Sequence, residues 1–149
     1  MEKIVIGRFE KADFPLLDLE NISIKIDTGA YTSSIHCDNI AEKEDMLYCT
    51  FLDEEHPLYN GKEFIFKNYD IVFVKSSNGI IQKRYQVQST IKIFDKNFKI
   101  SLSLSARQEM RFPVLIGRKF LTKKFLVDPE LIDVSYNLKA NEHKNHFQK

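Results

Sequence analysis

The chain has 149 residues, 43% of them hydrophobic, and a formal net charge of +1. This length suits one domain with a substantial core, and the nearly balanced charge excludes a global field that would attract nucleic acid or an acidic membrane surface. No apolar run approaches the roughly 18 residues of a membrane-spanning helix, and the first residues are too acidic for a secretory signal. We therefore expect a cytoplasmic protein whose two cysteines stay reduced.

The first half of the chain predicts short strands that lead to one acidic loop. Residues 22–26 alternate isoleucine with polar side chains, the period that is typical of a half-buried strand. Asp27-Thr28-Gly29-Ala30 follows directly, and an irregular stretch over 9–21, with Pro15, returns the chain to this strand. The other expected elements are strands over 4–6, 32–36 and 47–52, a charged loop over 42–45 and a turn-rich insertion over 53–62.

The second half predicts two hairpins and then a closing strand and helix. Asn78-Gly79 stands between apolar runs at 71–75 and 80–87, and both residues tolerate the positive φ of a tight hairpin turn. A second hairpin is expected over 90–104, with its turn at 95–97. The remaining expected elements are a buried strand over 112–117, a short helix over 118–125 and a last strand over 131–138.

These elements place the chain in the mainly β class, as a closed or barrel-like sheet with one short C-terminal helix. We expect a single domain over 1–138. The polar and charged segment 139–149 is expected to form a flexible C-terminal tail.

Asp27 is the first candidate for chemistry. A carboxylate at the end of a stiff strand, held by a glycine turn, can be fixed at the bottom of a cleft, and small neighbours let backbone and substrate come close. The simpler interpretation is a turn aspartate that caps a loop in an ordinary β-domain.

Three motifs together resemble a retropepsin-like aspartic protease. Residues 26–30 correspond to the active-site loop, the hairpin at 76–79 to the flap, and 114–118 with 120–121 to the apolar-apolar-Gly-Arg strand and helix that close a retroviral protease monomer. Within that group the chain most resembles the bacterial family labelled "ATP-dependent zinc protease", which is associated with ATP-grasp enzymes that add glutamate to a ribosomal protein. This closer resemblance is carried by 25–34, His36, 76–79, Arg84, 107–113, 115–118 and 127–129.

The resemblance implies an aspartic endopeptidase. In such an enzyme two carboxylates share one proton and activate a water molecule, without a cofactor. Because the chain has one Asp-Thr-Gly, we expect a homodimer in which Asp27 faces Asp27 of the partner subunit. The resemblance also implies that Thr28 joins the two loops, that Gly29 presents backbone to the substrate, and that the hairpin tip closes over it.

The resemblance further suggests which residues bind a peptide or protein substrate. Retroviral enzymes have an acid two positions after the glycine, and this chain has Tyr31, so Arg118 is expected to pair with Asp128 or with a substrate carboxylate. Several guanidiniums at one cleft would suit a glutamate-rich or glutamate-modified substrate, although each arginine could equally pair with a nearby acid. The candidate substrate-binding residues are Ala30, Ser76, Ser77, Asn78, Gly79, Arg84, Arg107 and Arg118.

Two other classes of protein compete with the peptidase. Tyr31 and the insertion at 53–62 leave open a retropepsin-fold module that binds peptides without cleaving them. A metal-dependent hydrolase is less favoured, because the sequence has no His-Glu-x-x-His, Cys-x-x-Cys or ATP-binding glycine loop. Successive side chains of a strand point to opposite faces, so the adjacent His36 and Cys37 do not suit one zinc ion with Cys49 and His56, and we expect no metal.

Overall fold

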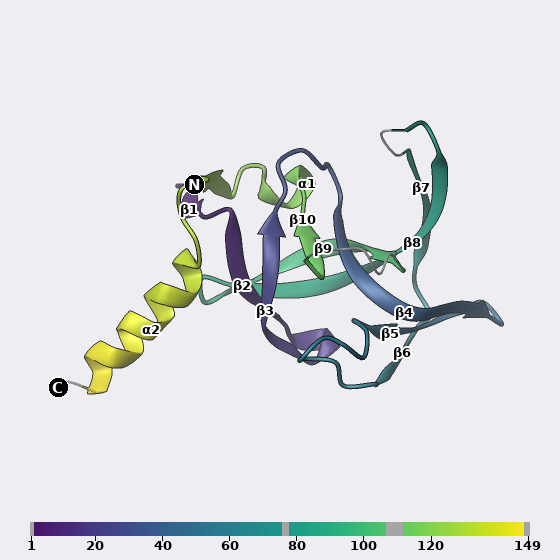
Figure 1. Cartoon of the computed structure of the whole chain (residues 1–149), viewed down its shortest axis with the longest axis horizontal. Coiled ribbons are helices and arrows are strands. Elements are labelled where there is room, and N and C mark those ends of the chain that lie inside the picture. The colour runs from purple at the N-terminus through teal and green to yellow at the C-terminus, as the bar shows by residue number, and fades with distance from the viewer. Residues whose placement is uncertain (1, 76–77, 107–111, 148–149) are drawn as a thin grey trace.

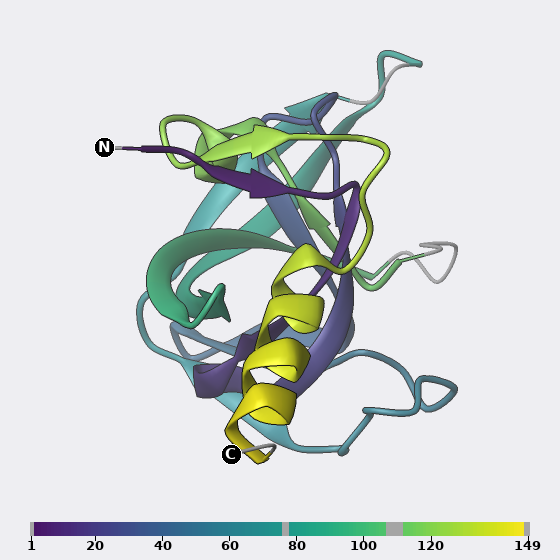
Figure 2. The ribbon, with the colours of Figure 1, turned by 90° about the vertical axis from the view of Figure 1, so that its left-hand side faces the viewer.

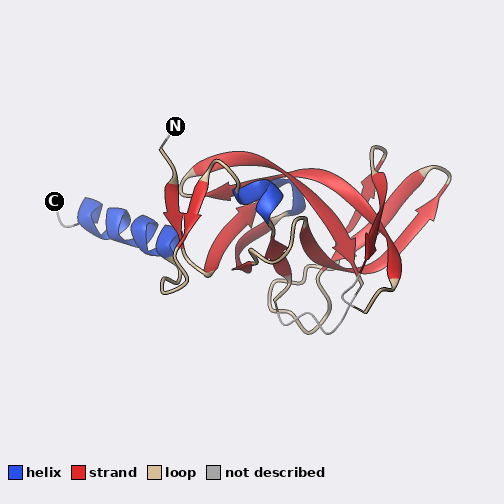
Figure 3. Cartoon of the chain, turned by 90° about the horizontal axis from the view of Figure 1, so that it is seen from above, coloured by secondary structure: helices blue, strands red, loops and turns tan. Residues whose placement is uncertain are grey.

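The computed structural model describes residues 2–75, 78–106 and 112–147. Its strands form a closed six-stranded barrel, so the predicted mainly β, barrel-like fold class is confirmed (Figures 1 and 3). Going round the barrel, each strand pairs with the next and the last pairs again with the first. The order is β10 (Val114–Ile116), β3 (Leu19–Ile26), β2 (Phe9–Phe14), β8 (Ile81–Ile93), β9 (Lys96–Ser105) and β4 (Ser33–Lys43).

The barrel encloses one apolar core. The isoleucines of β3 face inward as the alternation predicted, and Val87, Leu102 and Ile116 join them from other strands with less than 2% of their surface exposed. Burying a branched side chain of this size contributes about 1.5–3 kcal/mol. The core therefore holds the strands that carry the acidic loop.

Strand β2 lies where the sequence predicted an irregular stretch, and that prediction is wrong. The inward side chains of β2 are Glu10, Ala12 and Phe14. A buried glutamate breaks the apolar alternation by which a strand is recognised from sequence. The short 3-10 turn η1 (Pro15–Leu17) then connects β2 to β3.

Both predicted hairpins are present, and they share one long strand, β8, where the sequence predicted two separate strands. Its first part pairs with β7 (Asp70–Lys75) and its second with β9. The turn between β8 and β9 is made by Phe94 and Asp95, both at positive φ, slightly before the predicted 95–97. The long strand β4 continues into β5 (Met46–Phe51), which pairs with β6 (Glu63–Phe66), and the insertion at 53–62 contains no strand, as expected.

The C-terminal part differs from the prediction. The predicted helix over 118–125 is confined to α1 (Arg118–Leu121), and β11 (Phe125–Val127) pairs in parallel with β1 (Ile4–Ile6). A second helix, α2 (Val134–Phe147), replaces the strand predicted over 131–138. It extends away from the barrel (Figures 1 and 3). The flexibility expected of 139–149, and the domain limit at 138, stay predictions.

Buried Glu10 explains why a helix begins here. Its two carboxylate oxygens accept hydrogen bonds from the backbone N–H of Gly7, at 2.7 Å, and of Ser135, at 3.1 Å. A carboxylate at a helix N-terminus satisfies free N–H groups and complements the helix dipole. Burial of Glu10 raises the pKa of its carboxyl. Neither helix is long and apolar enough within the described ranges to cross a bilayer.

Candidate active site

The barrel places Asp27 through an unusual strand order. Strand β10 lies between β3 and β4, the two strands on either side of the acidic loop, parallel to the first and antiparallel to the second. The backbone N–H of Asp27 donates to the carbonyl of Ile116, at 2.8 Å, where β10 ends. Asp27 is thus held at the mouth of the barrel by a segment from the C-terminal part of the chain.

The loop itself fixes the carboxylate of Asp27. The N–H of Gly29 donates to Asp27 Oδ1 at 3.1 Å, and the N–H of Ala30 donates to the carbonyl of Asp27 at 3.2 Å. A Cβ at position 29 would lie 3.3 Å from Oδ1, so a side chain there would crowd the carboxylate. Asp27 Oδ2 receives no hydrogen bond from any described residue, and Thr28 and Gly29 are exposed.

Arg118 braces the loop from the helix side. Its Nη1 donates to the carbonyl of Thr28 at 2.9 Å, and its guanidinium carbon lies 5.9 Å from the centre of the Tyr31 ring. Within the described residues it makes no ion pair with Asp128, so that expected pairing is wrong. A cation above an aromatic face is attracted by the ring quadrupole, by about 0.5–1 kcal/mol at exposed sites. Tyr31 therefore supplies an attraction for Arg118 where retroviral enzymes have an acid.

Gly117 allows the two segments to approach this closely. A Cβ at this position would lie 2.6 Å from the backbone oxygens of both Tyr31 and Thr32. The next two residues bond across this close approach: the N–H of Arg118 donates to the carbonyl of Ala30 and the N–H of Lys119 donates to the carbonyl of Tyr31, both at 2.9 Å. We call residues 27–33 and 116–119, which these bonds join, the loop floor.

The predicted hairpin is present, and it rises from the same end of the barrel as the acidic loop (Figures 1 and 2). Gly79 has φ +84°, and Asn78 Oδ1 accepts a hydrogen bond from Ile80 N at 3.4 Å. Ser76 and Ser77, at the predicted tip, lie outside the described residues. The role of this hairpin as a flap stays a prediction.

The three arginines that the sequence singled out occupy different places. Arg118 contacts the loop floor, whereas Arg84 lies on β8 within the hairpin. Arg84 is half-buried, donates to Gln82 Oε1 at 3.2 Å, and lines a groove of about 540 Å³ with residues that include Ile40 and Leu104. Arg107 lies outside the described residues, so the expected convergence of all three is a prediction still.

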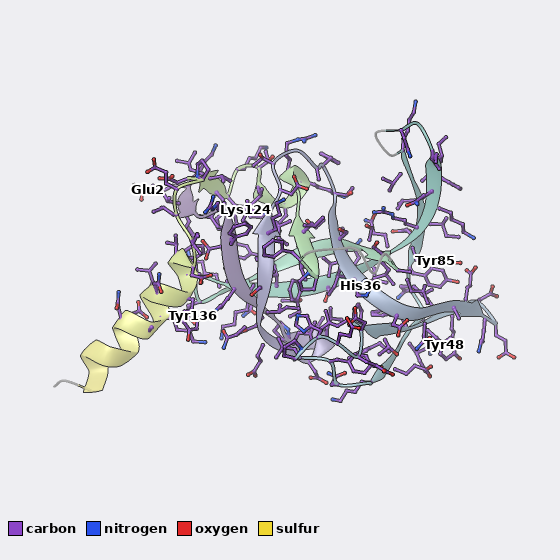
Figure 4. All side chains as sticks on the ribbon, viewed as in Figure 1. Glu2, His36, Tyr48, Tyr85, Lys124 and Tyr136 are labelled. Carbon is purple, nitrogen blue, oxygen red and sulfur yellow. The ribbon has the colours of Figure 1, made fainter. Side chains whose placement is uncertain are left out.

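The residues considered for zinc make other contacts. Buried His36, labelled in Figure 4, has Nε2 3.2 Å from Oδ2 of Asp53 in the insertion. Cys37 and Cys49 are buried free thiols, and burial, together with the nearby Cys49, raises the pKa of Cys37. Burial has the opposite effect on a base and lowers the pKa of His56, although the negative charge of Asp53 opposes that shift. The described ranges contain no group of three His, Cys, Asp or Glu residues that could hold a metal ion.

Comparison with known proteins identifies the family. Residues 5–136 match the family model of RimB-like proteins, described as "Retropepsin-like aspartic endopeptidase RimB". The chain belongs to this family. A RimB-like relationship also agrees with the strand order, because β10 brings the Gly-Arg pair against the Asp-Thr-Gly loop.

Curated relatives of this RimB-like chain carry another name. It is 37% identical over 133 residues to a "Probable alpha-L-glutamate ligase" of Shewanella halifaxensis, and 31% identical over 134 residues to one of Parasynechococcus marenigrum. The matches cover 85% and 86% of this chain but 29% and 28% of those relatives, so the chain spans under a third of their length.

A solved structure is also similar. The crystal structure of Lpg0085 from Legionella pneumophila, a protein described as having unknown function, superposes with a TM-score of 0.67 at 29% identity. The match covers 90% of the RimB-like chain and 99% of Lpg0085.

Sequence reasoning missed one residue that shapes the RimB-like site. Buried Ser33, at the start of β4, accepts a hydrogen bond from the N–H of Gly117 at 3.0 Å. This bond satisfies the amide where backbone packing excludes most partners. A hydroxyl-rich run after the loop was visible in the sequence, but only the position of β10 shows which hydroxyl is used.

Proposed function

We propose that this RimB-like protein is an aspartic endopeptidase whose site is completed by two Asp27 carboxylates, one from each subunit of a homodimer. The observation that carries the proposal is the state of Asp27. One of its oxygens is fixed by the Gly29 amide, and the other receives no hydrogen bond from the described residues. A fixed carboxylate with a free oxygen at an exposed loop is suited to binding a water molecule.

The mechanism follows from two carboxylates close together. Two like charges about 3 Å apart cannot both ionise, so the pair shares one proton and titrates as a unit. The ionised carboxylate takes a proton from water, which attacks the peptide carbonyl, while the protonated one donates to the carbonyl oxygen. Exposed Thr28 and Gly29 leave the loop accessible to a second copy related by a two-fold axis.

We propose an acidic peptide, rich in or modified with glutamate, as the substrate class. The support is indirect: the relatives that contain a segment similar to this chain are named for joining glutamate. Arg84 and Arg107 would bind carboxylates by paired hydrogen bonds, which a planar guanidinium makes well. Arg118 would act chiefly through the loop, because it both donates to the carbonyl of Thr28 and lies over the Tyr31 ring.

The test is cleavage of glutamate-rich peptides by the purified protein, followed by mass spectrometry. Asp27→Asn is expected to abolish cleavage while leaving the fold intact. Asp45→Asn is the matched control, because Asp45 is an exposed turn residue at positive φ, a conformation that asparagine tolerates. Equal activity of Asp27→Asn and the wild type would contradict the proposal, as would a monomer that cleaves.

The second candidate function is a peptide-binding module without activity. It is favoured by the relatives, because the segment similar to this chain makes up under a third of proteins that are named as glutamate ligases. This alternative expects no cleavage by the wild type and equal binding of acidic peptides by the wild type and Asp27→Asn.

A further inference from the structure

A small pocket with several lysines in its wall lies outside the Asp27 turn. It is formed where the start of β4 and the neighbouring strands β8 and β9 meet α1, and its volume is about 150 Å³. Sites for drug-sized ligands usually measure about 300–1,000 Å³, so this pocket suits one small group. Its wall includes Lys99, Lys119 and Lys124, and we call it the lysine pocket. Lys124 is labelled in Figure 4.

The lysine pocket is a local excess of positive charge. The whole chain is nearly balanced, with 22 Lys and Arg against 21 Asp and Glu, yet none of the described residues that line this pocket is an Asp or Glu. Exposed Lys99 and Lys119 have no carboxylate within 4.0 Å among the described residues. Three lysines in the wall of one pocket repel one another, so an anion bound there would be attracted by all three.

Other contacts prepare the pocket for a carboxylate. Lys124 is held in place, because its Nζ donates to the carbonyl of Phe120 at 2.8 Å and lies 4.7 Å from the Phe120 ring centre. Gln88 Oε1 accepts a hydrogen bond from Ser101 Oγ at 2.8 Å, which orients the amide and leaves its NH₂ group as a donor. Ammonium and amide donors around an anion form charge-assisted hydrogen bonds.

The lysine pocket adjoins the loop floor. Thr32 and Ser33 line it, and the backbone N–H of Lys119 donates to Tyr31. Thr32 is five residues after Asp27, so their Cα atoms are no more than about 18 Å apart, the length of fully extended chain. A peptide of about six residues spans that distance, so one substrate could reach both places.

We propose that the lysine pocket is an exosite that binds a carboxylate of an acidic peptide while another part of the same peptide lies at Asp27. This inference rests on the proposed function, because it assigns a second contact to the same substrate. The pocket would raise affinity for peptides with several glutamates, and the bond to be cleaved would lie some residues away from the glutamate it holds.

The test measures binding of a fluorescent decaglutamate peptide to the Asp27→Asn protein by anisotropy at fixed salt. Adding Lys99→Gln and Lys119→Gln is expected to weaken binding roughly three- to thirtyfold, from two exposed ion pairs of ordinary strength. The matched control adds Lys67→Gln and Lys96→Gln, which remove the same charge from exposed positions outside the pocket. Unchanged affinity in the pocket variant, or equal weakening by the control, would overturn the exosite.

Two further readouts separate the possible sources of the anion and the two proposals. The first readout is competition: a peptide site is expected to release decaglutamate only at a high concentration of inorganic phosphate. In NMR spectra, a shift of the Lys119 amide signal that phosphate causes and decaglutamate does not would overturn the proposal. The wild-type chain with the two lysine substitutions is expected to show a raised KM and an unchanged kcat, because the loop floor uses only the backbone N–H of Lys119, which the substitution keeps. Loss of cleavage in Asp27→Asn alone tests the peptidase, and the binding comparison decides the exosite whether or not cleavage occurs.

Discussion

The loop floor and the β7–β8 hairpin lie at the same end of the barrel but are held in opposite ways. Within the loop floor, backbone bonds from Asp27, Arg118 and Lys119 cross between segments distant in sequence. Strand β7, by contrast, pairs only with β8 among the described strands. The hairpin exposes large apolar side chains, with 71% of Phe73 on β7 and 64% of Ile81 on β8 exposed. The loop floor is thus tied to distant segments on several sides, whereas the hairpin has fewer contacts to restrain it.

The substitution with the largest expected effect on stability is Gly117→Ala, in the loop floor. The added Cβ would lie 2.6 Å from two backbone oxygens that cannot rotate away, so the loop floor must separate from β10. We expect a loss of about 3 kcal/mol in the free energy of unfolding, the upper range for overpacking, measured by urea denaturation. Gly29→Ala, at 3.3 Å from a side-chain oxygen, is the milder comparison. A Gly117→Ala protein as stable as the wild type would show that the floor is not rigid.

A smaller loss is expected when Arg118 is changed to Ala. The variant loses a charged hydrogen bond to Thr28 and the contact with Tyr31, together about 1–2 kcal/mol at this exposed position. The loop would gain freedom, so cleavage should fall in kcat more than it rises in KM. Arg118→Lys keeps the charge without the planar fork and should recover only part of the loss. Full activity in Arg118→Ala would mean that the backbone bonds alone position Asp27.

Phe73→Ser tests the hairpin side of the comparison. Because the ring is mostly exposed, the free energy of unfolding should change by no more than about 0.5 kcal/mol. If the hairpin closes over the substrate, the same change should raise KM for peptides. Leu16→Ser is the control, as another exposed apolar residue, placed in η1. Equal kinetics of both variants and the wild type would remove the hairpin from the site.

The smallest effect concerns the base of the hairpin. Tyr69, just before β7, donates its hydroxyl hydrogen to Glu42 Oε2, and this bond raises the pKa of the phenol to about 12. The raised value means that the neutral, donating phenol persists until strongly alkaline pH. Glu42→Gln is expected to lower the pKa towards 10 without unfolding the protein. The measurement is the tyrosinate absorbance on titration, with Tyr69→Phe to assign the change; an unaltered titration would show that the bond is not formed.

The sequence predicts local features better than those that depend on distant contacts. Local patterns predict Asp27 at a strand end and the turn at Asn78-Gly79, because both depend on neighbours in the chain. Strand β2 escaped because inward-facing Glu10 breaks its alternation, and α2 escaped because Ile132, Val134 and Tyr136 mimic the period of a strand. These assignments depend on contacts between β2 and the helix start, which no local pattern contains.

The contact of Tyr31 with Arg118 shows the same limit inside the site. The residue types permit a cation above an aromatic ring, yet the partners are far apart in sequence, and the sequence favoured Asp128 or a substrate instead. Only the insertion of β10 between β3 and β4 brings them together. The lysine pocket depends likewise on α1 meeting β8 and β9.

The position of β10 also sets an order of events during synthesis. Thr28 and Arg118, which join across the loop floor, are 90 residues apart in the chain. A ribosome adding roughly 5–20 residues per second needs several seconds to make that interval. Throughout it the loop lacks both the Ile116 carbonyl, which accepts from Asp27, and the Arg118 guanidinium, which donates to Thr28. The nascent chain therefore carries the Asp27 loop without these two supports until its last quarter emerges, so the loop reaches its final geometry late in synthesis.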